Sequence, residues 1–183
     1  KLGSVTAGER PWATMDVLIR ELLDDVIDKL SINGLTSADR DDLNNKWQSL
    51  DGWPDSSAGL SQLGNSFLLA ALSNGSIDML KNISNNANLA WDYVISAEMF
   101  GTYKPDPKVY LGACSVLGLP PENIMMVAAH KYDLEAAKTQ GMQTAFIMRL
   151  EEFGPLRDVD VASESFIDIY AYDFHQLATE LGA

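Results

Sequence analysis

Three short polar clusters, each following an apolar run, contain residue types that could do chemistry. The first is Ser73-Asn74-Gly75-Ser76, where a hydroxyl and an amide follow the run FLLAAL just ahead of a helical pattern. Side chains and free backbone N–H groups in such a place can hold an anion together. The same residues also suit a plain turn followed by a helix N-cap, so both interpretations stay open.

The second cluster is GTYKPDPKVY, which places Lys104 in a loop between a predicted strand and a helix started by proline. A lysine in an exposed loop is usually solvated and has no further role. If it points into a cleft instead, it supplies a cation that an acidic chain would otherwise lack there.

The third cluster lies in MMVAAHKYDLEAAKTQGMQTAF, where His130 and Asp133 follow a predicted strand. Asp133 stands at the opening of a helical pattern, so it could serve only as the helix N-cap, with His130 a loop residue. The alternative is that both side chains act at the carboxyl end of the strand.

The elements around these clusters alternate between strands and helices. Apolar runs predict strands over 67–72, 93–97, 124–128, 144–148 and 166–172. Helical patterns cover 77–83, 107–117 and 133–140, and a last helix is capped by Asp173 and closed at Gly182. This alternation predicts a doubly wound α/β core with a mainly parallel sheet, and function at the carboxyl ends of its strands. The run over 67–72 is expected to be buried on both faces.

The N-terminal part has a different pattern, because its apolar residues recur at helical spacing. Residues 12–30 form one amphipathic helix, and Thr36-Ser37 offers the N-cap of a second that continues through Leu43 and Trp47. Residues 1–58 therefore look wholly helical. We predict a helical domain over 1–58 and an α/β core over 59–183.

Composition limits the possible partners. The net charge of −13 argues against nucleic acid and anionic membranes, since both demand basic patches. The longest apolar run is too short to span a bilayer, and no signal-peptide core is seen at the start, so a cytoplasmic location is expected. The single Cys114 lies in an apolar helical pattern and is predicted to be a core residue. A small anionic substrate would need locally placed cations.

Taken together, in this order and spacing, the three clusters resemble motifs of the haloacid dehalogenase-like superfamily, closest to the type II 2-haloacid dehalogenases. LSNGS resembles its second motif, YKPDPKVY the third, and VAAHxxDLxAAxxxGMxTAF the fourth. GERPW and LDGWPD resemble the helical cap of that branch. Phosphatase members bind Mg²⁺ through paired acids, whereas Ala129 takes the place of the first acid here, so the resemblance implies neither metal nor cofactor.

The resemblance also implies a reaction and residue roles. An aspartate carboxylate would attack the α-carbon of a 2-halo acid, expel halide, and leave an ester that water hydrolyses. Ser73 and Asn74 would bind the substrate carboxylate. Lys104 would keep the nucleophile ionised, and Asp133 would activate the water. His130, which stands where many dehalogenases have asparagine, would contact the substrate.

The nucleophile itself is not found in this sequence. The first motif of the family is an apolar strand running into DxxGT, and nothing before Phe67 has that form. Asp16, Asp24 and Asp25 lie on the polar side of a predicted helix. We expect the first core strand to be absent and the 183 residues alone to be inactive. The opening without methionine favours a fragment of a longer enzyme.

Three alternatives stay open. The chain could be a truncated non-catalytic protein, or an interaction module that exchanges strands with another chain. A phosphatase with an altered metal site is the third. The expected partners are a small anionic 2-halo acid, and either the missing N-terminal segment or a second copy in a homodimer.

Overall fold

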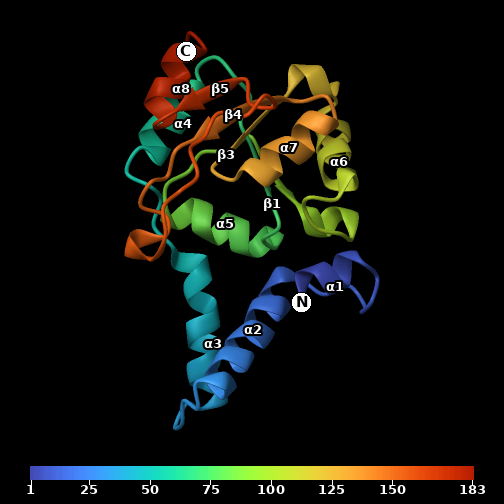
Figure 1. Ribbon diagram of the computed structural model, residues 1–183, viewed down its shortest axis with the longest axis vertical. Coiled ribbons are helices and arrows are strands. Elements are labelled where there is room, and N and C mark those ends of the chain that lie inside the picture. The colour runs from blue at the N-terminus through green and yellow to red at the C-terminus, as the bar shows by residue number, and fades with distance from the viewer. The chain divides into compact units, whose positions relative to one another are not determined.

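The computed structural model describes residues 1–183 (Figure 1). By contacts the chain divides into two compact units. Unit 1 comprises Lys1–Gly52 and Ala70–Tyr103, and unit 2 comprises Trp53–Leu69 and Lys104–Ala183. This division does not test the predicted helical domain, whose boundary at residues 58 and 59 stays a prediction. None of the helices has the length and apolar character needed to cross a membrane.

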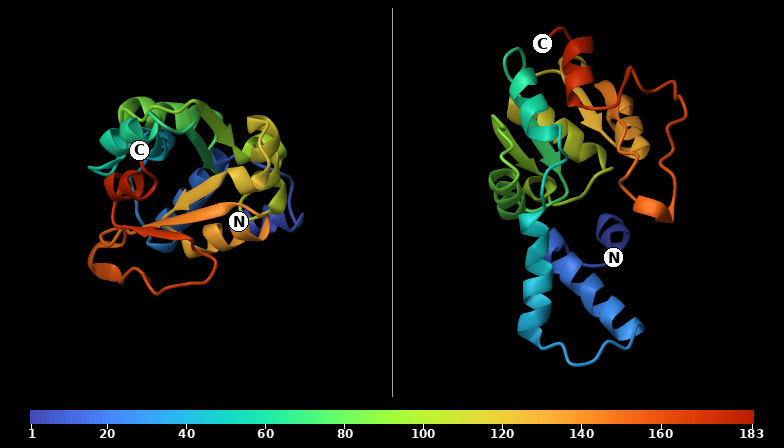
Figure 2. Two further views of the ribbon diagram at one scale, coloured as in Figure 1. Left: turned by 90° about the horizontal axis from the view of Figure 1, so that it is seen from above. Right: turned by 90° about the vertical axis from the view of Figure 1, so that its left-hand side faces the viewer.

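The helices of unit 1 begin with the short α1 (Leu2–Thr6), followed by α2 (Met15–Lys29), α3 (Ser37–Asn45) and the 3₁₀ helix η1 (Lys46–Ser49). Thr36 caps α3 through a capping box: its side chain accepts a hydrogen bond from Asp39 N, while the Asp39 carboxylate accepts from Thr36 N. The two long helices predicted in this region are therefore confirmed. Figures 1 and 2 show α2 and α3 side by side.

The apolar residues of α2 are only partly covered. Leu18 and Ile27 are 1 and 2% exposed, whereas Leu22, Val26 and Leu30 are 48, 49 and 63% exposed. An ion pair also joins α2 to α3, since Arg40 on α3 lies 2.8 Å from Asp24 on α2.

The sheet of unit 1 has two parallel strands, β1 (Ala70–Ser73) and β2 (Tyr93–Ser96), connected by α5 (Ile77–Asn86). Their register pairs Ala70 with Tyr93 and Ser73 with Ser96. The 3₁₀ helix η2 (Ala97–Phe100) follows β2.

Two details of the prediction for β1 are wrong. The strand begins at Ala70 rather than Phe67, because Phe67 N donates to Leu63 O and so belongs to the turn that ends a preceding helix. All four strand residues are only partly buried, whereas burial on both faces was expected.

Unit 2 contains a parallel sheet in the order β3 (Met125–Ala128), β4 (Gln143–Ile147) and β5 (Ile169–Ala171). Its helices are α4 (Ser56–Leu63), α6 (Pro107–Leu117), α7 (Lys131–Thr139) and α8 (Phe174–Glu180), with short 3₁₀ helices at Pro121–Asn123 and Gly154–Leu156. The core beside β4 and β5 is apolar and contains Leu63, Ala145, Ile147, Ala171, Leu177 and Ala178.

The strand and helix alternation is confirmed, and every strand pair is parallel. The strands nevertheless form two sheets where one was expected. The physical reason is that β1 pairs only with β2, and β3 only with β4, so one edge of each strand finds no backbone partner in this chain.

Helix α4 was not predicted, because its sequence DSSAGLSQL is rich in residues typical of turns. It packs against α8 (Figure 1). A Cβ on Gly59 would lie 2.2 Å from Phe174 Cβ, so a larger residue does not fit there. The small residues that suggested a turn instead permit two helices to approach closely.

Candidate functional site

Asp133 is a buried carboxylate whose two oxygens are both hydrogen-bonded. It lies in the first turn of α7 and is 7% exposed. Lys104 Nζ donates to its Oδ2 at 2.6 Å, and Tyr110 OH donates to its Oδ1 at 2.5 Å. The N-cap position of α7 is His130, so Asp133 does not have the capping role that was one of its two interpretations. A carboxylate that accepts a hydrogen bond on each oxygen, one from an ammonium and one from a phenol, is held in a fixed orientation.

Tyr110 was missed as a functional residue, although it ends the quoted segment YKPDPKVY. It lies one turn into α6, which is started by Pro107 and capped by Asp106, and it is fully buried. Burial raises the pKa of Tyr110, and its hydrogen bond to Asp133 and the charge of Asp133 raise it further. The phenol therefore stays protonated and donates. A signal for it existed in the helical spacing, which puts Tyr110 on the side of α6 that faces the core.

His130 contacts a residue that the sequence did not single out. Its Nε2 lies 2.7 Å from Glu152 Oε1, and the Tyr132 ring stacks on its imidazole with centroids 5.6 Å apart. The His130 side chain remains 45% exposed. It lies within unit 2, as do Lys104 and Asp133.

Ser73 and Asn74 belong to unit 1, where Ser73 ends β1 and the two residues begin the loop to α5. Ser73 Oγ accepts from Gly75 N at 3.1 Å. Ser96 Oγ, which is fully buried at the end of β2, donates to Gly75 O at 2.6 Å. A buried hydroxyl from the neighbouring strand thus holds this loop in place, and no motif singles out Ser96.

The idea of free backbone N–H groups at the start of α5 needs correction. Glu98 accepts from Ile77 N at 3.1 Å, and Ser76 Oγ accepts from Met79 N at 3.2 Å. With Gly75 N bonded to Ser73, three N–H groups that could have held an anion are already satisfied. These three N–H groups could hold an anion only after exchanging their present acceptors.

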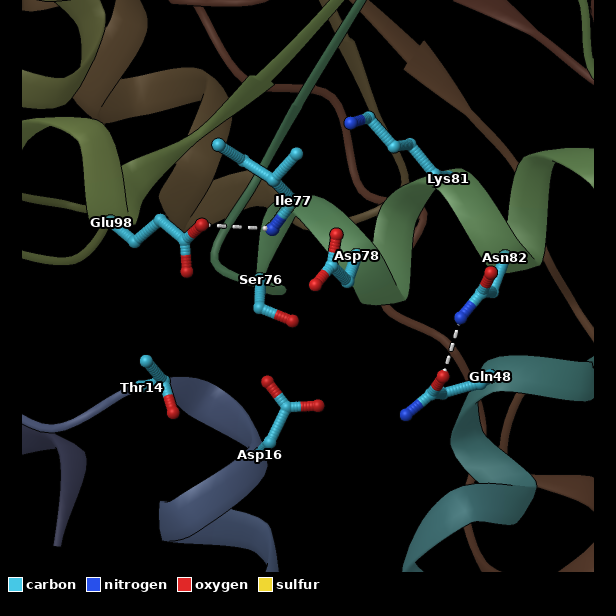
Figure 3. A pocket seen from close by; sticks show the side chains of 9 residues that line it. All are labelled: Thr14, Asp16, Gln48, Ser76, Ile77, Asp78, Lys81, Asn82 and Glu98. Carbon is cyan, nitrogen blue, oxygen red and sulfur yellow. Dashed lines mark hydrogen bonds between the residues drawn. The ribbon is translucent and has the colours of Figure 1, made fainter.

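Unit 1 also contains a cavity of about 640 Å³ beside the start of α5 (Figure 3). Two hydrogen bonds join residues of its lining in Figure 3: Asn82 donates to Gln48, and Ile77 N donates to Glu98. It is lined by Thr14, Asp16, Gln48, Ser76, Ile77, Asp78, Lys81, Asn82 and Glu98. Three carboxylates against one ammonium make this cavity a poor site for an anion. Ser73 and Asn74 are not part of its lining.

No group of three or more His, Cys, Asp and Glu side chains in the structure is arranged to hold a metal ion. Cys114 is buried in α6, and burial raises the pKa of its thiol. That surrounding agrees with the predicted core role and does not suit a nucleophile, which needs a thiolate.

The fold and the Asp133 cluster define a class of protein, and comparison with known families agrees. The model of the haloacid dehalogenase-like hydrolase family matches residues 14–147. The chain belongs to that family.

Curated proteins with similar sequences include (S)-2-haloacid dehalogenases. (S)-2-haloacid dehalogenase 4A from Burkholderia cepacia is 32% identical over 126 residues, which make up 64% of this chain and 54% of the relative. The chain spans about half the length of the curated relatives it matches.

Two solved structures are also similar. The crystal structure of an L-2-haloacid dehalogenase superimposes with a TM-score of 0.95 at 40% identity, covering 98% of this chain and 79% of that one. A defluorinating L-2-haloacid dehalogenase superimposes with a TM-score of 0.95 at 39% identity, covering 100% of this chain and 75% of that one.

Proposed function

We propose that these residues are part of an enzyme that hydrolyses the carbon–halogen bond of small 2-halo carboxylic acids. The observation that supports this most directly is the buried Asp133, with Lys104 and Tyr110 on its two oxygens. The names of the relatives supply the substrate class, which is proposed here by similarity to them.

The proposed reaction has two steps. A nucleophilic aspartate attacks the α-carbon with its carboxylate oxygen, forming an ester bond while the carbon–halogen bond breaks and halide departs. Water then attacks the carbonyl carbon of the ester, giving the 2-hydroxy acid and regenerating the carboxylate. The hydroxyl oxygen of the product comes from the aspartate, and water restores the oxygen of the enzyme.

The roles of the described residues follow from their chemistry. Asp133 accepts a proton from the attacking water in the second step. Lys104 is an ammonium 2.6 Å from Asp133, and its charge also favours an ionised nucleophile. Tyr110 keeps the Asp133 carboxylate oriented. By motif, Ser73 and Asn74 bind the substrate carboxylate, and His130 contacts the substrate.

The nucleophile is proposed to lie outside these 183 residues. Asp133 is an unsuitable nucleophile, because both of its oxygens are hydrogen-bonded and its side chain is 9% exposed. A further parallel strand that ends in an aspartate would supply this nucleophile, because functional side chains of parallel sheets lie at the carboxyl ends of the strands.

The test is release of halide from L-2-chloropropionate. The longer protein that contains these residues is expected to release chloride without added metal, whereas residues 1–183 alone are expected to release none. Asp133→Asn should slow release by about 10²-fold or more, because a general base is lost. Asp158→Asn, which removes an exposed acid of the same unit, is the matched control. Absence of chloride release by the longer protein would overturn the proposal.

Oxygen labelling tests the ester intermediate. In a single turnover in ¹⁸O water, with enzyme in excess, the product should be unlabelled because its new oxygen comes from the aspartate. Label in the product of that first turnover would mean that water attacks the α-carbon directly. Mg²⁺-dependent hydrolysis of a phosphate ester, without chloride release, would support the phosphatase alternative.

A further inference from the structure

His130 pairs in unit 2 with Glu152, a residue that has no part in the mechanism above. Its contact is short, with Nε2 of the imidazole 2.7 Å from Oε1 of the carboxylate. The two residues are 22 positions apart in the sequence, so the fold and not local geometry brings them together. His130 is three residues before Asp133 and lies in the short loop between β3 and α7.

Glu152 is held in a fixed position by the segment that follows β4. Glu152 N donates to Arg149 O at 3.0 Å, which closes a turn. Arg149 forms a bidentate pair with Asp55, at 2.7 and 3.0 Å, and its side chain is 10% exposed. Trp53 also stacks against the Arg149 guanidinium. The turn that presents Glu152 is therefore anchored by a buried ion pair.

The contact between Glu152 and His130 requires a hydrogen between its two atoms. An ionised carboxylate can only accept, so at 2.7 Å from Glu152 Oε1 the hydrogen belongs to Nε2 of His130. Glu152 therefore favours the form of the ring that is protonated at Nε2.

A fixed proton on Nε2 decides what the other ring nitrogen does. Nδ1 of His130 is then the nitrogen available to a ligand, and it donates a hydrogen bond when the ring is fully protonated. Tyr132 stacks on one face of the ring at an interplanar angle of 14°, which restricts its rotation. The titratable groups that face His130 are Glu152 and the Tyr132 phenol, whose pKa is raised by burial and by the charges of Asp133 and Glu152.

We propose that Glu152 is a positioning residue: it accepts a hydrogen bond from Nε2–H of His130, so that the protonated ring donates its Nδ1–H to a small anion, the carboxylate of the substrate or the departing halide. This inference rests on the proposed function for the identity of the anion. The tautomer of His130 that the inference requires can be measured in residues 1–183, whatever the substrate is.

The tautomer is measured by ¹⁵N NMR of residues 1–183 at a pH where the rings are neutral. The chain has two histidines, so His175 serves as an internal reference. His130 is expected as the Nε2–H tautomer in the wild type. Glu152→Gln, which keeps an acceptor oxygen, should preserve it, and Glu152→Ala should give a mixture of tautomers. Glu151→Ala removes the neighbouring exposed acid and should change nothing. An Nδ1–H tautomer in the wild type would overturn the inference, whatever the reaction is.

The kinetic arm uses halide release by the longer protein. Glu152→Ala is expected to raise KM for 2-chloropropionate about 10-fold, the size of one charge-assisted hydrogen bond, and Glu152→Gln should restore most of the loss. Equal damage by both variants, or none by either, would overturn the positioning role. The NMR spectrum of Glu152→Ala shows whether this variant folds. If it does not fold, KM of Glu152→Gln tests the positioning role instead. Absence of halide release in the wild type would instead count against the proposed function, and the tautomer would still be tested.

Discussion

At the scale of single residues, the cluster around Asp133 combines function with a structural cost. Lys104 and Asp133 are charges with side chains 11 and 9% exposed, so each depends on the other for compensation. Tyr110 adds a neutral donor to the same carboxylate. A site of this kind is stable only while all three members are present.

Removing one charge of this pair should therefore be worse than removing both. Asp133→Leu is expected to lower the free energy of unfolding by about 3–5 kcal/mol, because the buried ammonium of Lys104 loses the carboxylate charge 2.6 Å away. The double variant with Lys104→Met should lose less than the sum of the single variants. Urea unfolding of the four proteins measures this coupling. Additive losses would contradict it.

Tyr103 provides a test by pH. It is fully buried, and its pKa is raised to about 12 by burial first and then by the charges of Glu98 and Asp16. The fold thus favours the neutral phenol. The stability that comes from this raised pKa is fully present below pH 10, the ordinary pKa of tyrosine. It is lost as the pH rises from 10 to about 12, because the unfolded chain loses the phenol proton first. We expect the urea midpoint to fall in this range, and to fall less in Tyr103→Phe. An identical fall in both proteins would contradict the assignment.

At the scale of elements, the contact of α4 with α8 depends on the absence of a side chain at Gly59. Gly59→Ala is expected to lower the free energy of unfolding by about 1–3 kcal/mol, since its Cβ would overlap Phe174. Gly3→Ala is the matched control in α1, where a Cβ meets nothing within 4 Å. It should be neutral or slightly stabilising, as a helical glycine replaced by alanine usually is. Thermal unfolding of the two variants tests this, and equal midpoints would contradict the close contact at Gly59.

Elements with local signals were predictable from the sequence. Helix α6 has its predicted bounds because Pro107 starts it and Gly118 ends it in a left-handed conformation. Helix α4 was missed because its reason for being helical is Phe174, far along the chain.

The same distinction applies to the site. Lys104, Asp133 and Ser73 were selected from motif wording and stay predictions, whereas Tyr110, Ser96 and Glu152 contact partners 21 to 23 residues away in the sequence. Such partners become visible only when the strands and helices are packed together.

At the scale of the whole molecule, charge is the dominant property. The chain has 26 acidic and 13 basic residues, so unscreened acids repel one another in the folded state. Raising NaCl from roughly 0.05 to 0.5 M shortens the screening length several-fold, and we expect the urea midpoint at pH 8 to rise. A fall would mean that surface ion pairs, such as Arg40 with Asp24, outweigh the net repulsion.

Unit 2 is built from two separate stretches of the chain, Trp53–Leu69 and Lys104–Ala183, and this affects how it folds during synthesis. Asp55 and α4 leave the ribosome well before their partners, because Phe174, whose N–H Asp55 accepts, comes 119 residues later. At roughly 5–20 residues per second, translation takes about 6–24 s to deliver that partner. During this interval Leu63, buried in the finished fold, lacks its core partners Ala145, Ala171 and Leu177. The nascent chain therefore exposes this apolar surface for several seconds, long before its chemistry is assembled.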